Sequence, residues 1–171
     1  MRRSLVLLVV SLVALVAALG PGLLGGGRAE GGGGTVVGAV TRVVDGDTIR
    51  VLTGGRAERV RYIGIDTPES VRPGTPVQCY AHRAATENAR LVRGERVRLV
   101  FDVERRDRFG RLLAYVYRSR DGAFVNAALV RGGFARTLTV PPNVRFAARF
   151  ARLARQARRA GRGLWSVCAS P

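Results

Sequence analysis

Residues 59–70 read RVRYIGIDTPES, a β-branched and aromatic run that stops at Asp66 and continues as Thr-Pro-Glu. Residues 43–51, about one hairpin upstream, read VVDGDTIRV and place Asp47 beside another apolar run. Between the two runs stands Thr-Gly-Gly-Arg, a sequence typical of a tight hairpin turn. If the two strands pair through that turn, the start of one, at Asp47, lies beside the end of the other, at Asp66. Two carboxylates then converge at one end of a sheet.

The rest of the domain alternates between strand and helix patterns. The strands predicted from period-two alternation and turn residues fall within residues 36–65, which read as a three-stranded meander, and at 95–103 and 110–118. The helices predicted from apolar spacing cover 81–94, 123–133 and about 143–161, with Asn143 as the N-cap of the last. Five strands with helices at their edges are typical of the OB-fold. The sequence therefore predicts an α+β chain built on a five-stranded β-barrel with about three helices.

The last predicted helix carries a continuous apolar stripe with arginines on its other faces. The stripe consists of Phe146, Phe150, Leu153 and Ala157. A helix that lies on a membrane surface has this pattern. A helix docked on the barrel with a solvated basic back has it as well, and beside a predicted barrel this second interpretation is favoured.

Charge is the strongest compositional signal. The 171 residues carry a formal net charge of +17, and arginine supplies the basic excess because the chain contains no lysine. A field of this sign attracts polyanions such as nucleic acids. The alternative is a solvated arginine-rich surface without a partner. Charge alone favours nucleic acid without deciding the matter.

The N-terminus has the composition of a targeting segment followed by a linker. Arg2 and Arg3 precede an uncharged apolar run, so residues 1–24 are interpreted as either a signal peptide or an uncleaved N-terminal membrane anchor. Residues 25–34 form a glycine-rich linker, and residues 35–171 form the folded domain. Both alternatives place the domain outside the cytoplasm, either secreted or anchored to the outer face of the cell membrane.

The two cysteines, Cys79 and Cys168, agree with an oxidising compartment, where such a pair tends to form a disulfide. The bridge would close roughly 90 residues and contribute on the order of 4 kcal/mol in the chain-entropy model. Two unrelated buried thiols are the alternative. Two cysteines and one histidine, His82, cannot form a zinc site.

Oxygen atoms dominate the predicted site. Asp47 and Asp66 would converge without histidine or thiolate, a donor set that suits Ca²⁺ or Mg²⁺ rather than zinc or copper. Thr67 is held extended by the following proline, which would aim its carbonyl at the same ion. Glu69 follows closely enough to contact a water on that ion. Taken alone, the Asp-Gly-Asp segment is equally typical of an ordinary turn.

Two arginines complete the arrangement. Arg61 precedes Asp66 by five residues, and on a straight strand that odd separation puts the two side chains on opposite faces. They can share a site only if the strand ends or bends near Gly64, where glycine permits a bulge. Arg111 stands at the start of the last predicted strand. A divalent ion, an acid and two guanidinium groups suit phosphoryl chemistry, whereas each arginine taken alone is more simply a surface ion pair.

Five segments occur in the order and spacing of one family: VVDGDTIRV, RYIGIDTPE, DRFGRLLAYVY, NAALVRGGFAR and a closing GLW at residues 163–165. In these segments the chain resembles the staphylococcal-nuclease-like, or thermonuclease, family. The likeness covers about residues 36–166, essentially the whole domain. It rests on DGDT, R-x₄-D-T-P-E and D-x-x-G-R in combination.

The resemblance implies an OB-fold, export from the cell, and Ca²⁺-dependent hydrolysis of DNA and RNA by a monomer. By motif, it implies that the metal ligands are Asp47, Asp66 and the carbonyl of Thr67, and that the catalytic residues are Arg61, Glu69 and Arg111. Glu69 would orient or deprotonate water, and the arginines would bind phosphate and stabilise the transition state. The cysteine pair resembles one found in exported relatives, which favours the disulfide.

The residues expected to contact the nucleotide base differ from the family pattern. Arg108 and Phe109 are expected to contact substrate, but Phe109 stands where a tyrosine is common. Leu138 and Val140 stand in the segment where the type member has tyrosines that stack on a base. Loss of a stacking face costs about 1–3 kcal/mol per base. We therefore expect altered base contacts beside a complete hydrolytic set.

Two functions stay open on the sequence. The first is an exported nuclease with little sequence specificity. The second is a non-catalytic nucleic-acid-binding module on the same barrel, which the complete set of acids and arginines disfavours. A membrane tether through residues 1–24 is compatible with either.

Overall fold

The computed structural model describes residues 34–70, 74 and 76–168. The segment expected at 1–24, and all but the last residue of the linker expected at 25–34, lie outside these residues. Among the described residues, none of the helices combines the length and the apolar character that a membrane span requires.

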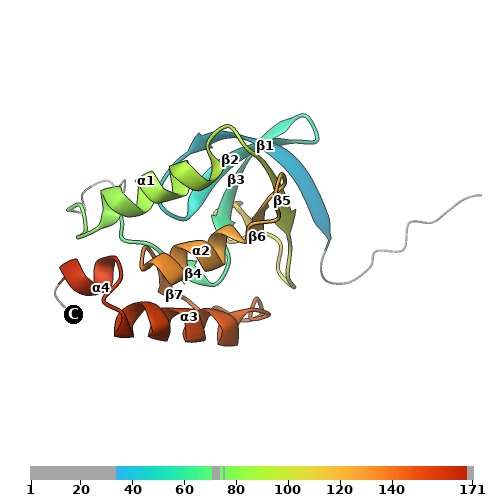
Figure 1. The fold of residues 1–171 in the computed structure, drawn as a ribbon. Coiled ribbons are helices and arrows are strands. Elements are labelled where there is room, and N and C mark those ends of the chain that lie inside the picture. The colour runs from blue at the N-terminus through green and yellow to red at the C-terminus, as the bar shows by residue number, and fades with distance from the viewer. Residues whose placement is uncertain (1–33, 71–73, 75, 169–171) are drawn as a thin grey trace, which may run out of the picture.

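The barrel consists of five strands: β1 (Thr35–Val43), β2 (Thr48–Thr53), β3 (Arg56–Tyr62), β5 (Arg96–Val100) and β6 (Leu112–Arg118). It closes in the order β1, β2, β3, β6, β5, as Figure 1 shows. Neighbouring strands are antiparallel except β3 and β6, which run parallel. The predicted five-stranded barrel of the OB type is confirmed.

The helices lie at one side and one end of the barrel (Figure 1). They are α1 (Ala81–Val92), α2 (Val125–Gly132), α3 (Ala147–Arg159) and the short α4 (Leu164–Val167). α1 packs against β1, and α2 lies between the barrel and α3. Two short strands, β4 (Ile65–Asp66) and β7 (Arg136–Thr137), form a separate antiparallel pair. Together with α4, they are elements that the sequence did not predict.

Alternating strand residues fill the barrel with β-branched and aliphatic side chains. Ile49, Val51, Val60 and Leu99 are fully buried. Burial of one such side chain stabilises the fold by about 1.5–3 kcal/mol. The period-two pattern of the strands thus places the hydrophobic core inside the barrel. A functional site can then form only at an end of the barrel or on its outer surface.

The apolar stripe of α3 packs against α2 and reaches β6 of the barrel through aromatic rings. Phe150 is buried, and its ring centroid lies 6.3 Å from that of Tyr115 on β6. Phe146 stands edge-on to Tyr115 at 4.6 Å. Leu153 and Ala157 continue the buried stripe. Because this face of α3 is covered by the domain itself, the docked interpretation of the helix is confirmed.

The last helix begins later than predicted, at Ala147, and no side chain caps its first turn. Asn143 is buried and pairs with the backbone of Glu104 instead. Its Oδ1 accepts the Glu104 N–H at 2.8 Å, and its Nδ2 donates to the Glu104 carbonyl at 2.9 Å. The expected N-cap was wrong because a partner distant in sequence satisfies the Asn143 side chain.

β3 ends three residues earlier than predicted because the chain turns at Gly64, where φ is +80°. Asn126 of α2 holds this turn. Its Nδ2 donates to the Ile63 carbonyl at 2.9 Å, and its Oδ1 accepts the Val116 N–H, also at 2.9 Å. The bend that Arg61 and Asp66 require is therefore present at the glycine where the sequence predicted it.

Replacement of Gly64 by alanine will destabilise the domain more than replacement of Gly54. A Cβ at Gly64 would lie 2.5 Å from the Phe150 ring, whereas no described atom lies within 4 Å of a Cβ at Gly54. Both glycines have positive φ, so both variants carry a backbone cost of about 1–2 kcal/mol. Crowding against Phe150 adds about 1–3 kcal/mol. Urea unfolding of both variants measures the difference, and equal destabilisation would contradict the packing described for Gly64.

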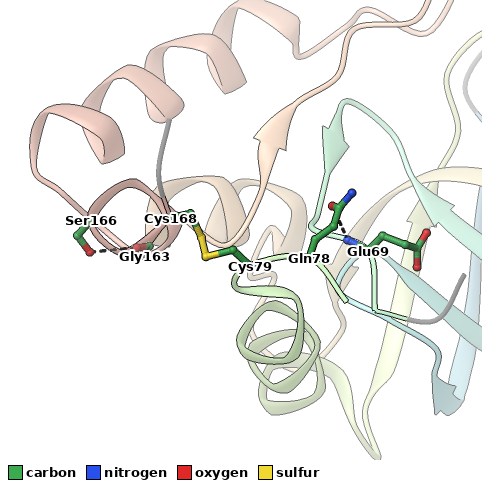
Figure 2. Close-up of a disulfide and its surroundings, with 6 residues drawn as sticks. All are labelled: Glu69, Gln78, Cys79, Gly163, Ser166 and Cys168. Carbon is green, nitrogen blue, oxygen red and sulfur yellow. Dashed lines mark hydrogen bonds between the residues drawn. A yellow bond between two sulfur atoms is a disulfide. The ribbon is translucent and has the colours of Figure 1, made fainter. Parts of the chain in front are cut away.

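A disulfide joins Cys79, just before α1, to Cys168, just after α4 (Figure 2). The two Cα atoms are 5.8 Å apart, and the bridge spans 89 residues. The predicted pairing is confirmed. It ties the C-terminal end of the described chain to the loop that leads from β4 to α1.

Candidate active site

The Asp-Gly-Asp turn between β1 and β2 places Asp47 in the interior. The Asp47 N–H donates to Oδ1 of Asp45 at 3.0 Å, and the Asp47 carbonyl accepts the Tyr62 N–H of β3 at 2.9 Å. Only 5% of Asp47 is exposed. A Cβ on Gly46 would lie 2.6 Å from Oγ1 of Thr67, so this glycine lets the turn approach the segment after β4.

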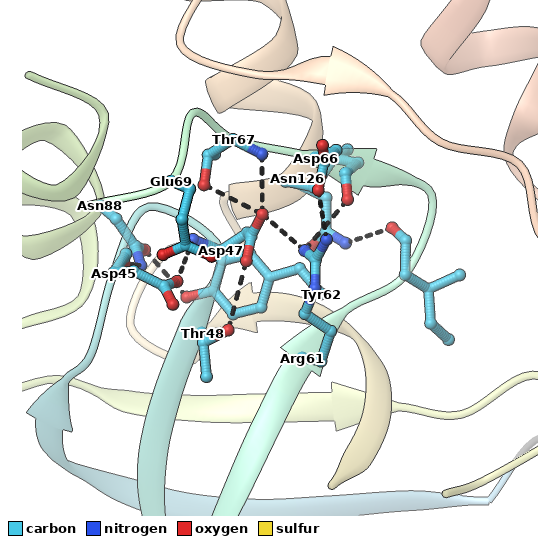
Figure 3. Close-up of polar contacts among 12 residues, drawn as sticks. Asp45, Asp47, Thr48, Arg61, Tyr62, Asp66, Thr67, Glu69, Asn88 and Asn126 are labelled. Carbon is cyan, nitrogen blue, oxygen red and sulfur yellow. Dashed lines mark hydrogen bonds and ion pairs between the residues drawn. The ribbon is translucent and has the colours of Figure 1, made fainter. Parts of the chain in front are cut away.

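Thr67 binds the Asp47 carboxylate from the segment that follows β4. Its N–H and its hydroxyl both donate to Oδ2 of Asp47, at 2.8 and 2.9 Å (Figure 3). The hydroxyl of Thr48 donates to Oδ1 at 3.2 Å. The sequence predicted a role for the Thr67 carbonyl and missed these two hydrogen bonds, which join segments 20 residues apart.

Arg61 contacts both of the carboxylates that are predicted to bind the metal. Its Nη1 lies 2.6 Å from Oδ2 of Asp47, and its Nη2 lies 2.7 Å from Oδ1 of Asp66. Nη1 also donates to the Ile65 carbonyl at 3.0 Å. Figure 3 shows Asp47 and Asp66 on either side of the guanidinium group. The structure thus brings Asp47, Asp66 and Arg61 into direct contact.

Burial raises the pKa of Asp47 to about 7. The Arg61 guanidinium and the Thr67 hydrogen bonds act in the opposite direction, and the nearby Asp45 carboxylate adds to the rise. Desolvation therefore outweighs the contact with Arg61. The protonated form of Asp47 is therefore more stable than that of an exposed aspartate.

Arg111 is oriented by a turn that the sequence did not single out. Oδ1 of Asp107 accepts the N–H groups of Phe109 and Arg111 at 2.9 and 3.0 Å, and its Oδ2 accepts Nε of Arg111 at 2.7 Å. Burial of Asp107 opposes its ionisation, but these hydrogen bonds prevail and lower its pKa. The D-x-x-G-R motif contained the signal, since the aspartate precedes the arginine at a fixed spacing.

The predicted metal and catalytic residues border one polar hollow of about 150 Å³ at the end of the barrel. Its lining residues are Asp45, Asp47, Thr48, Arg61, Asp66, Thr67, Pro68, Glu69 and Arg111. Asp45, which the sequence indicated only as part of a turn, lines the same hollow. Parallel pairing of β3 with β6 brings Arg111, just before β6, to the hollow.

A second hollow of about 480 Å³ adjoins the first and shares Arg61 and Arg111 with it. Its wall includes the two predicted substrate residues, Arg108 and Phe109, and also Leu138 and Val140. Phe109 is 68% exposed, with the Arg108 guanidinium 4.8 Å from its ring centroid. This surface offers apolar and aromatic contacts immediately beside the charged centre.

The oxygen donors of the first hollow fit a hard cation. Across the described residues, no group of three or more His, Cys, Asp and Glu side chains is arranged as a metal site. Two carboxylates, Asp47 and Asp66, nevertheless both contact Arg61 and line the same hollow. Mg²⁺ is commonly held by one or two carboxylates with water and phosphate oxygens, and Ca²⁺ takes carboxylate, carbonyl and water oxygens together.

A closed OB barrel that gathers acids and arginines at one polar hollow is suited to bind a phosphate-containing substrate. A family model described as staphylococcal nuclease homologue matches residues 59–167. The chain belongs to this family.

Comparison with curated relatives supports the same family assignment. The chain is 39% identical over 127 residues to a thermonuclease of Staphylococcus hyicus, which covers 74% of each protein. It is 40% identical over 126 residues to a thermonuclease of Staphylococcus intermedius, again with 74% of each covered. It is also 40% identical to endonuclease YncB of Bacillus subtilis over 73% of this chain and 59% of that protein. The resemblance stated from the motifs is confirmed.

Proposed function

We propose that this chain is an exported, Ca²⁺-dependent nuclease that hydrolyses phosphodiester bonds of DNA and RNA with little sequence specificity. Its family and the thermonucleases and endonuclease it resembles make it a hydrolase of the nuclease class. The observation that carries the finer proposal is the bridge of Arg61 between Asp47 and Asp66, in a hollow that Glu69 and Arg111 also border.

Asp47, Asp66 and the Thr67 carbonyl would hold the cation. When bound, Ca²⁺ would supply positive charge beside a phosphate oxygen. Arg61 contacts both of the carboxylates that would hold the cation. This places its guanidinium group where it would also bind the phosphate.

Glu69 would accept a proton from the attacking water, or orient that water, as a bond forms between the water oxygen and phosphorus. The phosphorus–oxygen bond to the leaving group then breaks. Arg61 and Arg111 would donate to the phosphate oxygens, whose charge grows in the five-coordinate transition state. Asp107 keeps Arg111 aimed through the 2.7 Å contact with its Nε.

The adjoining hollow would receive a base or sugar. Phe109, Leu138 and Val140 are exposed and apolar, so they offer contact area without the hydrogen-bond pattern that distinguishes one base from another. Arg108 beside Phe109 would contact the phosphate backbone. This composition supports cleavage with little sequence preference.

Export is supported by the disulfide and by the arginine-flanked apolar run of residues 1–24. We assign that run to a signal peptide or a membrane anchor, residues 25–34 to a linker, and residues 35–171 to the nuclease domain. The domain would act as a monomer, secreted or held at the outer face of the membrane.

An assay of purified protein on plasmid DNA and on single-stranded RNA tests this function. We expect degradation of both substrates with Ca²⁺ and none after a Ca²⁺ chelator is added. Retention of nucleic acid in a gel-shift experiment without any product would contradict the proposal and favour the non-catalytic binding module. Cleavage that persists in chelator would contradict the metal requirement alone.

A further inference from the structure

Glu69 lies in a segment without regular secondary structure. It follows β4 by three residues, and residues 67–69 belong to neither strand nor helix. Asp47, Arg61 and Thr67, by contrast, are fixed by the barrel and by one another. Thr67 therefore anchors the start of this segment, and contacts outside the barrel position Glu69, two residues further on, in part.

Gln78 supplies two such contacts. The Glu69 N–H donates to Oε1 of Gln78 at 2.8 Å, and the Gln78 N–H donates to the Glu69 carbonyl at 3.0 Å. These bonds fasten both peptide groups of Glu69 to one residue nine positions later. Figure 2 shows Gln78 between Glu69 and the disulfide.

Gln78 is itself held from its other side. Its carbonyl accepts the N–H of Ala81, the first residue of α1, at 3.0 Å. The next residue, Cys79, is bonded to Cys168, whose N–H donates to the Leu164 carbonyl at 3.0 Å. Leu164 is buried. A covalent and hydrogen-bonded path therefore runs from the core through the disulfide to Gln78.

We propose that Gln78 is a positioning residue for Glu69, and that the Cys79–Cys168 disulfide keeps Gln78 in place. This inference rests on the proposed role of Glu69. Loss of the Gln78 side chain or of the disulfide lets the Glu69 backbone shift. A misplacement of about 1 Å can lower a reaction rate by about 10²-fold. The cation ligands and both arginines stay in place, so the turnover number falls while substrate affinity is retained.

Gln78→Leu and Gln78→Glu separate the positioning role from side-chain bulk. Leucine removes the acceptor for the Glu69 N–H, whereas glutamate keeps a carboxyl oxygen there. We expect Gln78→Leu to lower kcat about tenfold with KM for nucleic acid little changed, and Gln78→Glu to recover most of kcat. Gln156→Leu, at an exposed site on α3, is the matched control and should cleave like the wild type. Wild-type kcat in Gln78→Leu, or an equal loss in the glutamate variant, would overturn the proposal.

A double-mutant cycle shows whether Gln78 acts through Glu69. In a Glu69→Gln background, Gln78→Leu should cause no further loss of kcat, because the group it positions is already disabled. Multiplicative losses from the two changes would overturn the proposal. Wild-type protein that cleaves nothing refutes the proposed function itself, whereas a cleaving wild type with an unaffected Gln78→Leu refutes only this inference.

The double variant Cys79→Ser, Cys168→Ser tests the second part. We expect its kcat to fall by a factor similar to that of Gln78→Leu, with KM retained and a folded circular dichroism spectrum at the assay temperature. Wild-type kcat in a folded double variant would overturn the role of the disulfide. If this variant does not fold, reduction of the wild type at low temperature, followed by the same assay, gives the same two outcomes.

Discussion

The Arg111→Ala variant is expected to cleave nucleic acid about 10²–10³-fold more slowly than the wild type while keeping its fold. The guanidinium group borders the polar hollow and is fixed by Asp107, so it is already in place to stabilise charge on the phosphate. It does not contribute to the hydrophobic core, and its removal leaves the barrel intact. Initial rates on a fluorescent oligonucleotide, together with thermal unfolding, measure both parts of the prediction.

Arg152→Ala is the matched control for this experiment. Arg152 is exposed on α3, and its loss removes the same formal charge from the protein without touching the hollow. It should change the cleavage rate by less than about twofold at moderate salt, since distant surface charges are largely screened. If Arg111→Ala and Arg152→Ala behave alike, Arg111 contributes only general charge and its assigned role is wrong.

The Asp47→Asn variant is expected to lose metal-dependent cleavage by about 10²-fold or more, because the amide supplies no charge to a cation. Its effect on stability depends on pH. The pKa of Asp47 is raised from 3.8 to about 7, so the native state holds this proton in a range where the unfolded chain has released it. Without metal, the wild type therefore loses stability as the pH rises from about 4 to about 7. Asparagine cannot ionise, so the variant lacks this part of the pH dependence.

Urea unfolding in the presence of a chelator, at about pH 4.5 and about pH 8, measures this difference. The stability of Asp47→Asn relative to the wild type should increase between the two pH values. A relative stability that stays constant or decreases would show that Asp47 is not held with a raised pKa. Added Ca²⁺ should stabilise the wild type at the higher pH and have little effect on the variant.

The sequence predicted the parts of the site that follow from periodicity and local chemistry. Arg61 and Asp66 stand an odd number of residues apart, so their shared role required a bend, and Gly64 was the residue able to provide it. The structure has that bend, with φ of +80° at Gly64. The barrel strands were also predictable, because each has several alternating residues with one face buried.

Partners distant in sequence were not predictable in the same way. The pairing of Asn143 with Glu104 displaced a helix start that local rules favoured. The contacts of Thr67 with Asp47 depend on how two turns meet in space. β4 and β7 have two residues each, too few to produce a periodic pattern. Asp107 was visible within a motif, but its function depends on the turn that presents Arg111.

A crystal structure with Ca²⁺ and a hydrolysis-resistant phosphorothioate dinucleotide tests most directly whether these acids and arginines form one catalytic centre. We predict a cation coordinated by carboxylate oxygens of both Asp47 and Asp66, with the phosphate of the dinucleotide within hydrogen-bond distance of Arg61 and Arg111. A cation bound away from these carboxylates, or a phosphate that neither arginine contacts, would contradict the account.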